Sequence, residues 1–136
     1  MMTVVMIVFL LYDVVLLWLR YQWKNLVSTT VASASEVKFI SVVVPVRNEE
    51  GVIGKLIQSL SVQQYPADRF EVIIVDDFST DRTVSVAEDL IAQLSISVRI
   101  ISSASAGKKQ TITTGVQAAK GGIILTTDAD CTMGAE

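Results

Sequence analysis

The chain has 136 residues, of which 51% are hydrophobic, and it carries a formal net charge of −3 with no histidine. The lack of histidine excludes His-based catalytic triads and His-ligated zinc, and the positive residues are too scattered to form a basic face for nucleic acid. The single cysteine cannot form an internal disulfide, so a reducing compartment is allowed.

Residues 1–20 are predicted to form a transmembrane helix. The run Met1–Leu19 is almost wholly apolar, and its nineteen residues at helical rise nearly match a hydrocarbon core of about 30 Å. Aromatic and basic residues of the kind that anchor a helix at an interface follow at its end, namely Trp18, Arg20, Tyr21, Trp23 and Lys24. Because no Lys or Arg precedes the run, the positive-inside rule predicts a plasma- or inner-membrane protein whose following domain is cytoplasmic.

Asp13 interrupts the apolar run. A carboxylate in mid-span costs roughly 2.5–3.5 kcal/mol on insertion scales, so it is expected to face a partner helix or a protein interior. The alternative is a secretory signal, since residues 32–34 (Ala-Ser-Ala) resemble a cleavage site. That site lies more than ten residues past the run, and no basic residue precedes the run, so a retained anchor followed by a juxtamembrane linker over 21–37 is favoured.

From residue 38 onward, strand and helix patterns alternate. Continuous apolar, β-branched runs predict strands at 39–45, 70–77, 96–101 and 123–125. Apolar stripes at helical spacing predict three helices between them, the first capped by Asn48, the second by Ser79 or Thr80, and the third over 108–119. This order predicts an α/β, Rossmann-like fold with a parallel sheet and helices on both faces.

The strand ends carry the polar residues. The first strand is expected to stop at Pro45, which cannot donate to a ladder, and the last is expected to be a buried strand. Ligands collect at the carboxyl ends of strands in open α/β sheets. The rim formed there is predicted to hold Pro45–Glu49, Asp76 with Asp77, and Asp128 with Asp130.

So many acids on one rim call for a positive partner. Carboxylate oxygens suit Mg²⁺ or Mn²⁺, with a nucleotide diphosphate as bridging ligand, so Asp128 and Asp130 are predicted to hold metal and ribose. Asp77 can accept hydrogen bonds from a base or sugar, and Lys108 can offer an ammonium to a phosphate. Two roles stay open for Asp76, which either braces its turn or binds ligand.

Four segments in this order and spacing, SVVVPVRNEE, VIIVDDFSTDRT, GKKQTITTG and GGIILTTDADC, resemble the family 2 glycosyltransferases. The resemblance covers Ile40–Cys131. It implies a GT-A fold and an inverting, metal-dependent transfer of sugar from a nucleotide-diphospho-sugar to the hydroxyl of a sugar or lipid acceptor. It assigns a donor-binding set of Pro45, Arg47, Asn48, Glu49, Asp77, Lys108 and Asp128, with Asp77 facing the base. It also assigns a metal site in which Asp130 is the direct ligand and Asp128 lies nearer the ribose.

The sequence departs from the family pattern at two positions. The third motif commonly reads Gly-Lys-x-x-Ala-Leu-Asn-x-Gly, and here Thr113 stands in place of the asparagine. Arg47 stands where an aromatic residue is frequent. Family members carry their acidic general base well downstream, so it is expected beyond Glu136. Residues 38–136 are therefore expected to be the N-terminal, donor-binding part of a longer enzyme, inactive by itself.

Three other functions remain open. A nucleotidyltransferase also uses paired aspartates, but it is expected to have a Gly-rich loop after the first strand, and PVRNEEG is a poor example of one. A signalling receiver needs a phosphorylated aspartate after a later strand, and Ile96–Ile101 is followed by serines. The third is a truncated or degenerate, non-catalytic membrane protein that binds nucleotide or nothing. The intact set of acids argues against long decay, while the end of the sequence at Glu136 argues for this alternative.

Overall fold

The computed structural model describes residues 2–25 and 37–135, and the chain divides into two units, residues 1–36 and 37–136. The first unit contains one helix, α1 (Met2–Asn25). The second contains, in chain order, β1 (Ile40–Val46), α2 (Ile53–Ser61), a short 3-10 helix (Ala67–Arg69), β2 (Phe70–Asp76), α3 (Thr83–Ile91), β3 (Ser97–Ser102), α4 (Lys108–Ala118) and β4 (Ile123–Thr126).

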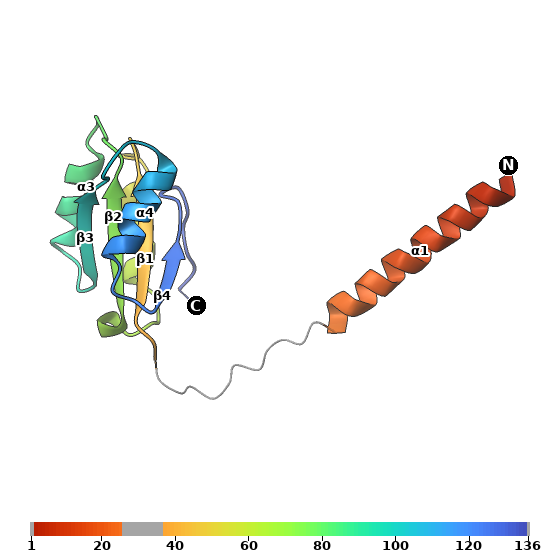
Figure 1. Ribbon diagram of the computed structural model, residues 1–136. Helices are drawn as coiled ribbons and strands as arrows, with labels where there is room; N and C mark the ends of the chain where they lie inside the picture. Colours follow the sequence, from red (N-terminus) through yellow and green to blue (C-terminus); the bar gives the residue numbers. More distant parts are fainter. Residues whose placement is uncertain (1, 26–36, 136) are drawn as a thin grey trace. The chain divides into compact units, whose positions relative to one another are not determined.

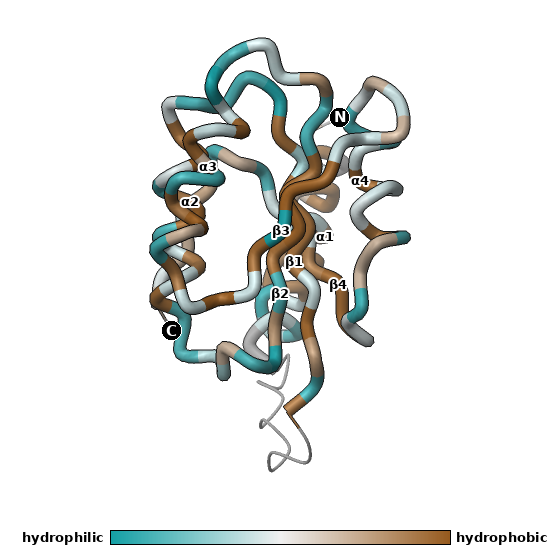
Figure 2. The backbone as a smooth tube through the Cα atoms, turned by 90° about the vertical axis from the view of Figure 1, so that its left-hand side faces the viewer, coloured by the Kyte–Doolittle hydropathy of each residue, from teal (hydrophilic) through white to brown (hydrophobic). Residues whose placement is uncertain are grey.

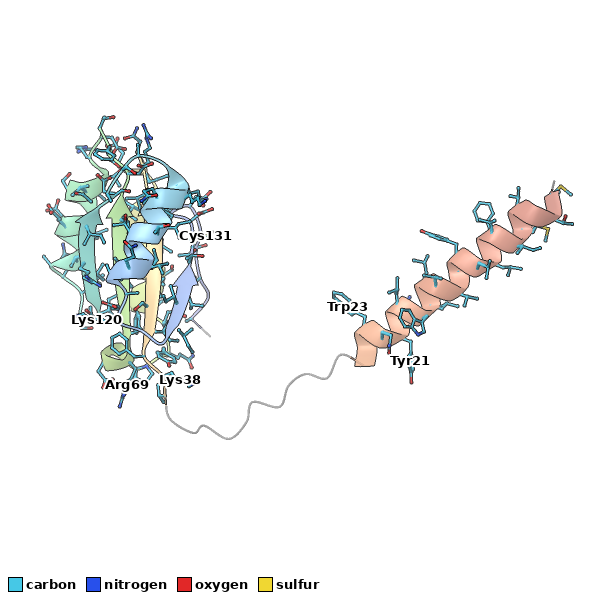
Figure 3. All side chains as sticks on the ribbon, in the orientation of Figure 1. Tyr21, Trp23, Lys38, Arg69, Lys120 and Cys131 are labelled. Carbon is cyan, nitrogen blue, oxygen red and sulfur yellow. The ribbon has the colours of Figure 1, made fainter. Side chains whose placement is uncertain are left out.

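Helix α1 has the properties of a membrane span by length and composition. Its segment Val5–Trp23 is 19 residues long and apolar enough to cross a membrane, and none of it is buried. Tyr21 and Trp23 project near its C-terminal end (Figure 3). Helix α1 continues past the predicted span of 1–20 as far as Asn25. The candidate cleavage site at 32–34 lies outside the described residues.

The second unit is built on a four-stranded parallel sheet with the order β3-β2-β1-β4 (Figure 1). Strand β1 pairs with β2 along its whole length, from Ile40 opposite Phe70 to Val46 opposite Asp76. The chain adds strands outward from β1 to β3, and α4 then leads back to the other side of β1, where β4 pairs. The predicted α/β class and parallel sheet are confirmed, and the strand order reverses between β1 and β4.

The helices form two layers around the sheet. Helices α2 and α3 lie on one face and α4 lies on the other, with the apolar strands between them (Figure 2). The α2/α3 face forms the larger core, which includes Val44, Ile57 and Ile74, while Val43, Ile73 and Val75 form the α4 face. Alternate residues of β1 and β2 therefore point to opposite faces, as parallel strands covered on both sides require.

Strand β1 does not end at Pro45 as predicted, but continues to Val46. The carbonyl of Val46 accepts the Asp77 N–H at 2.8 Å on the β2 side, and the carbonyl of Val43 accepts the Thr127 N–H at 3.2 Å on the β4 side. Backbone groups alternate in direction along a strand, so the nitrogen of Pro45 faces the β4 side beyond the end of β4. The missing N–H therefore costs no ladder hydrogen bond, and the prediction was wrong for that reason.

The prediction that the last strand is buried was also wrong. Strand β4 lies at the edge of the sheet, and its apolar residues Ile123, Ile124 and Leu125 are 40%, 38% and 49% exposed. Helix α4 packs on β1 and β2 and α3 packs on β3, so these helices do not cover β4. An apolar composition identified the strand, but its burial depended on which elements lie above it.

A buried carboxylate, Glu71, links the elements at the amino ends of the strands, the end of the sheet opposite to the predicted ligand rim. Glu71, 2% exposed, accepts hydrogen bonds from Ser41 Oγ at 2.7 Å, from the Lys120 N–H at 2.8 Å and from Arg99 Nε at 3.2 Å. Burial disfavours the charged form, but these hydrogen bonds and the nearby guanidinium outweigh it, so the pKa of Glu71 is lowered. Glu71 thereby ties together β1, β2, β3 and the turn before β4.

Candidate functional site

The carboxyl ends of β1, β2 and β4 surround one cavity of about 270 Å³. It lies where the strand order reverses, which is the usual ligand position in an open α/β sheet. The residues that line it come from four separate segments of the chain: Pro45, Val46, Arg47, Glu49, Asp77, Lys108, Thr111, Asp128, Ala129 and Asp130. Seven of the eight residues predicted to bind donor or metal therefore meet at one cavity.

Asp77 is the buried acid of this cavity. Only 5% of it is exposed, and its two carboxylate oxygens accept the Gly107 N–H at 2.9 and 3.1 Å. Arg47, at the start of the loop after β1, places its Nη1 3.5 Å from Asp77 Oδ2. The carboxylate is thus oriented by the backbone of the third motif and paired with a half-exposed guanidinium, in a position to accept a hydrogen bond from a ligand.

The segment Asp128–Asp130 follows β4 and presents its two acids to the same cavity. Ala129 between them is 3% exposed and packs into the core on the α2/α3 face, while both aspartates are exposed. The Cys131 N–H donates to the Asp128 carbonyl at 3.3 Å, which closes a turn. A small residue anchored between two acids explains the Asp-x-Asp spacing, because burial of the middle side chain directs both neighbours outward.

Lys108 pairs directly with one of these acids. Its Nζ lies 2.8 Å from Asp128 Oδ1, and the hydrogen bond and charge of Asp128, with the charge of Asp130, raise the pKa of Lys108. Lys108 is the first residue of α4, and the preceding Gly107 has φ of 115°, a conformation that favours glycine. The Gly-Lys pair therefore turns the chain into the helix and points an ammonium at the Asp-x-Asp acids.

The oxygen ligands that the cavity offers suit a divalent cation such as Mg²⁺. Asp128 and Asp130 supply two hard oxygen ligands at the cavity wall. The described residues contain no group of three or more His, Cys, Asp or Glu side chains that could hold a metal ion. Mg²⁺ typically binds one or two carboxylates and completes its octahedron with waters and substrate phosphates, so two aspartates suffice when a diphosphate is present.

Asn48 does not line the cavity and does not cap α2, which begins at Ile53 with no side-chain cap. Its backbone adopts a left-handed φ of 56°, and its Oδ1 accepts the Thr80 N–H at 2.8 Å. The cap prediction was wrong because Asn48 bonds to the loop after β2 instead. Neither Ser79 nor Thr80 caps α3 either, since Asp81 Oδ1 accepts the N–H of Thr83, the first helical residue, at 3.0 Å.

The loops after β1 and β2 are held together by further hydrogen bonds of this kind. Backbone N–H groups of the first loop donate to side chains of the second loop and of the first residue of α3: Asn48 to Ser79 Oγ at 3.0 Å, Glu50 to Asp81 Oδ2 at 3.2 Å and Glu49 to Thr83 Oγ1 at 2.7 Å. In the opposite direction, Glu50 Oε2 accepts the Arg82 N–H at 3.0 Å. These contacts fix the two loops that carry Arg47, Glu49 and Asp77.

Three further residues complete the description of the site. Thr111, one turn into α4, is fully buried, lines the cavity and donates to the Gly107 carbonyl at 3.0 Å, a role that the sequence did not indicate. Its position one turn after the Gly-Lys pair was the available signal. Asp76 accepts the Ser79 N–H at 3.2 Å and does not line the cavity, so of its two open roles the structure has it bracing the turn. Thr113, in place of the family's asparagine, bonds to the Lys109 carbonyl of its own helix.

Comparison with known proteins gives one family. The family model described as glycosyl transferase family 2 matches residues 41–136. The beta-monoglucosyldiacylglycerol synthase of Synechocystis sp. is 40% identical over 97 residues, covering 69% of this chain and 20% of its own length. The poly(ribitol-phosphate) beta-N-acetylglucosaminyltransferase TarS of Staphylococcus aureus is 36% identical over 90 residues, covering 66% of this chain and 16% of its own. The chain thus spans a fifth or less of these relatives.

Solved structures agree with the fold. TarS residues 1–349 in complex with UDP match with a TM-score of 0.66 and 30% identity, over 72% of this chain and 29% of that one. The mannosyltransferase PcManGT from Pyrobaculum calidifontis, in complex with GDP-Man and Mn²⁺, matches with a TM-score of 0.69 and 28% identity, over 84% of this chain and 35% of that one.

Proposed function

The chain belongs to glycosyl transferase family 2, and from this premise we propose that residues 37–136 bind the nucleotide-diphospho-sugar donor and the divalent cation of a membrane-anchored glycosyltransferase. The observation that carries the proposal is the cavity at the reversal point of the sheet. Arg47, Asp77, Lys108, Asp128 and Asp130 meet there, although their segments are far apart in the sequence. Such a cavity offers acceptors for a base and ribose and positive charge for a diphosphate.

The donor is proposed to lie with its base near Asp77 and its diphosphate near the start of α4. Asp77 is held rigidly by the Gly107 N–H, so its remaining acceptor capacity can select a base. The N-terminus of α4 offers a positive dipole end, and Lys108 adds an ammonium there. The solved neighbours that hold UDP and GDP-Man support a nucleotide-sugar of this general form.

Asp130 and Asp128 are proposed to hold Mg²⁺ or Mn²⁺, with Asp130 as the direct ligand. When bound, the cation supplies the positive charge that stabilises a departing nucleoside diphosphate. The Mn²⁺ in the PcManGT complex supports the choice of a divalent cation. Ala129 keeps the two carboxylates on the cavity side by its own burial, so the ligands do not have to be ordered at the moment of binding.

The reaction proposed for the whole protein is an inverting transfer. The acceptor hydroxyl oxygen attacks the anomeric carbon as the bond from that carbon to the diphosphate breaks, and the electron pair leaves with the diphosphate. The hydroxyl proton passes to an acidic general base that the family pattern places downstream of Glu136. The residues of this chain bind and orient the donor and stabilise the leaving group, and α1 is proposed to anchor them at the cytoplasmic side of the membrane.

Nucleotide binding tests the proposal directly. Titration of the chain in detergent with UDP and with GDP, with and without Mn²⁺, is expected to show binding of one nucleotide that requires the metal. Asp130→Asn is expected to abolish the metal-dependent binding of nucleotide. Asp68→Asn, which changes an exposed acid of the short 3-10 helix, serves as the control. Metal-dependent binding that survives Asp130→Asn would contradict the ligand role. A nucleoside triphosphate that binds more tightly than its diphosphate would favour a nucleotidyltransferase instead.

A further inference from the structure

The ion pair between Lys108 and Asp128 belongs to two hollows of the surface. The first is the 270 Å³ cavity described above, and the second, of about 420 Å³, is lined by residues of α4, of β4 and of the segment after β4. Pro45, Lys108 and Asp128 line both. A ligand that extends from one hollow to the other would therefore contact the pair.

Lys108 also competes with a metal ion for one of the two carboxylates. Its Nζ is 2.8 Å from Asp128 Oδ1, so the ammonium already neutralises this carboxylate and repels a divalent cation that approaches it. Among residues 37–135, Asp130 forms no salt bridge, and its carboxylate accepts only the weak Cys131 Sγ contact at 3.8 Å. The two acids are thus unequal, with one neutralised by the protein itself and one available to a cation.

We propose that Lys108 is an exchangeable counter-ion, which holds Asp128 until donor and divalent cation bind and then moves from that carboxylate to the donor's diphosphate. The inference rests on the proposed function and adds to it the sign of the effect of Lys108 on each binding step. Lys108 opposes the binding of a metal ion alone, because both cations compete for Asp128. It favours the binding of metal and nucleoside diphosphate together, because the displaced ammonium then has a phosphate to pair with.

The geometry allows this exchange at small cost. The side chains of Lys108 and Asp128 are 64% and 54% exposed, and exposed ion pairs shift an equilibrium by about fivefold at most. A lysine suits the role because its ammonium is a point charge on a flexible stem, which can change partner without losing a bidentate geometry. The first cavity is lined by four acids, Glu49, Asp77, Asp128 and Asp130, and two cations, so moving one cation leaves negative charge for a metal.

Metal binding measured separately from nucleotide binding tests this assignment. Mn²⁺ affinity of the full chain in detergent is measured by electron paramagnetic resonance without nucleotide, and UDP and GDP affinities are then measured at saturating Mn²⁺. Lys108→Gln is compared with Lys109→Gln, which removes the same charge from the next residue, exposed and outside both hollows. Lys108→Arg restores the charge, and circular dichroism checks that each variant is folded.

The expected result is a change of opposite sign in the two measurements. Lys108→Gln is expected to raise Mn²⁺ affinity about twofold to fivefold and to lower nucleotide affinity about tenfold or more, with Lys109→Gln near wild type in both. Equal Mn²⁺ affinities in the two glutamine variants would overturn the exchange. If Asp130→Asn abolished Mn²⁺ binding in that case, the proposed donor site would still stand. Wild-type protein that binds no Mn²⁺ even in the presence of UDP or GDP would overturn both.

Discussion

Asp77 accepts the Gly107 N–H with both of its carboxylate oxygens, at 2.9 and 3.1 Å, across thirty residues of sequence. This contact joins the end of β2 to the start of α4, so the acid that is proposed to face the base also sets where α4 begins. The orientation of Lys108, the next residue, depends on the same contact. The residues proposed to contact the base and the diphosphate are therefore linked by one backbone N–H.

Replacement of Asp77 by alanine is expected to destabilise the second unit by about 1–3 kcal/mol, because it removes a buried acceptor from the Gly107 N–H. Asp77→Asn keeps an oxygen at that position and is expected to lose about half as much or less. Urea unfolding of the chain in detergent, followed by circular dichroism, measures both. Equal stability of the alanine variant and the wild type would show that the contact contributes nothing to the fold.

Gly115 allows the close approach of α4 to the sheet. A Cβ added there would overlap Val43 Cγ1 and lie 2.9 Å from Val75 Cγ2. Gly115→Ala is therefore expected to destabilise the second unit by about 1–3 kcal/mol through overpacking, despite the better helix propensity of alanine. Gly122→Ala, whose Cβ meets nothing within 4 Å, is the matched control and is expected to change stability by about 0.5 kcal/mol or less.

Asn48 combines a left-handed backbone with a side-chain contact, and two substitutions separate these contributions. Asn48→Gly removes the acceptor for Thr80 but tolerates φ of 56°, while Asn48→Ala removes the acceptor and strains the backbone as well. The alanine variant is expected to be less stable than the glycine variant by about 1 kcal/mol. Thermal unfolding of the two variants measures the difference, and an alanine variant as stable as the glycine variant would refute the strain.

The order of strands and helices and the shared rim followed from the sequence because they depend on local hydrophobic patterns and on one topological rule. The roles of Asn48, Ser79 and Thr80 did not follow. Each has the chemistry of a helix cap, but in the structure they serve contacts between two loops that are more than thirty residues apart. Local pattern cannot distinguish a capping side chain from one that bonds to a distant backbone group.

The buried acid Glu71 was missed, although a signal was present. Ser41, Glu71 and Arg99 are polar residues near the start of three strands, of which the first two read as buried apolar runs. Polar residues in such runs need partners, and parallel strands bring equivalent positions side by side, as the pairing of Ser41 with Glu71 shows. The apolar run of β4 predicted a buried strand, whereas its exposure follows from its position at the edge of the sheet, with no helix of the described residues over it.

Glu71 gives a prediction for the dependence of stability on pH. Burial alone would raise its pKa, but the hydrogen bonds from Lys120, Ser41 and Arg99 lower it below the ordinary value of 4.5. The ionised form therefore contributes stability that is fully present above about pH 4.5 and is lost as the pH falls through the lowered folded-state pKa. Wild-type protein is expected to lose this contribution on acidification.

Glu71→Gln removes the titrating group while keeping an oxygen for the Ser41 hydroxyl and the Lys120 N–H. It is expected to be about 2 kcal/mol less stable than wild type at pH 7, since hydrogen bonds to a charged acceptor are lost, and the difference is expected to shrink towards pH 3. Asp81, whose pKa is lowered by its hydrogen bonds with Thr83, titrates in the same direction in both proteins and cancels from the difference. Glu88→Gln, on an exposed glutamate of α3, controls for the loss of one charge. Urea unfolding at pH 7, 5 and 3 measures the three proteins, and a difference between Glu71→Gln and wild type that is constant over this range would show that ionised Glu71 does not stabilise the fold.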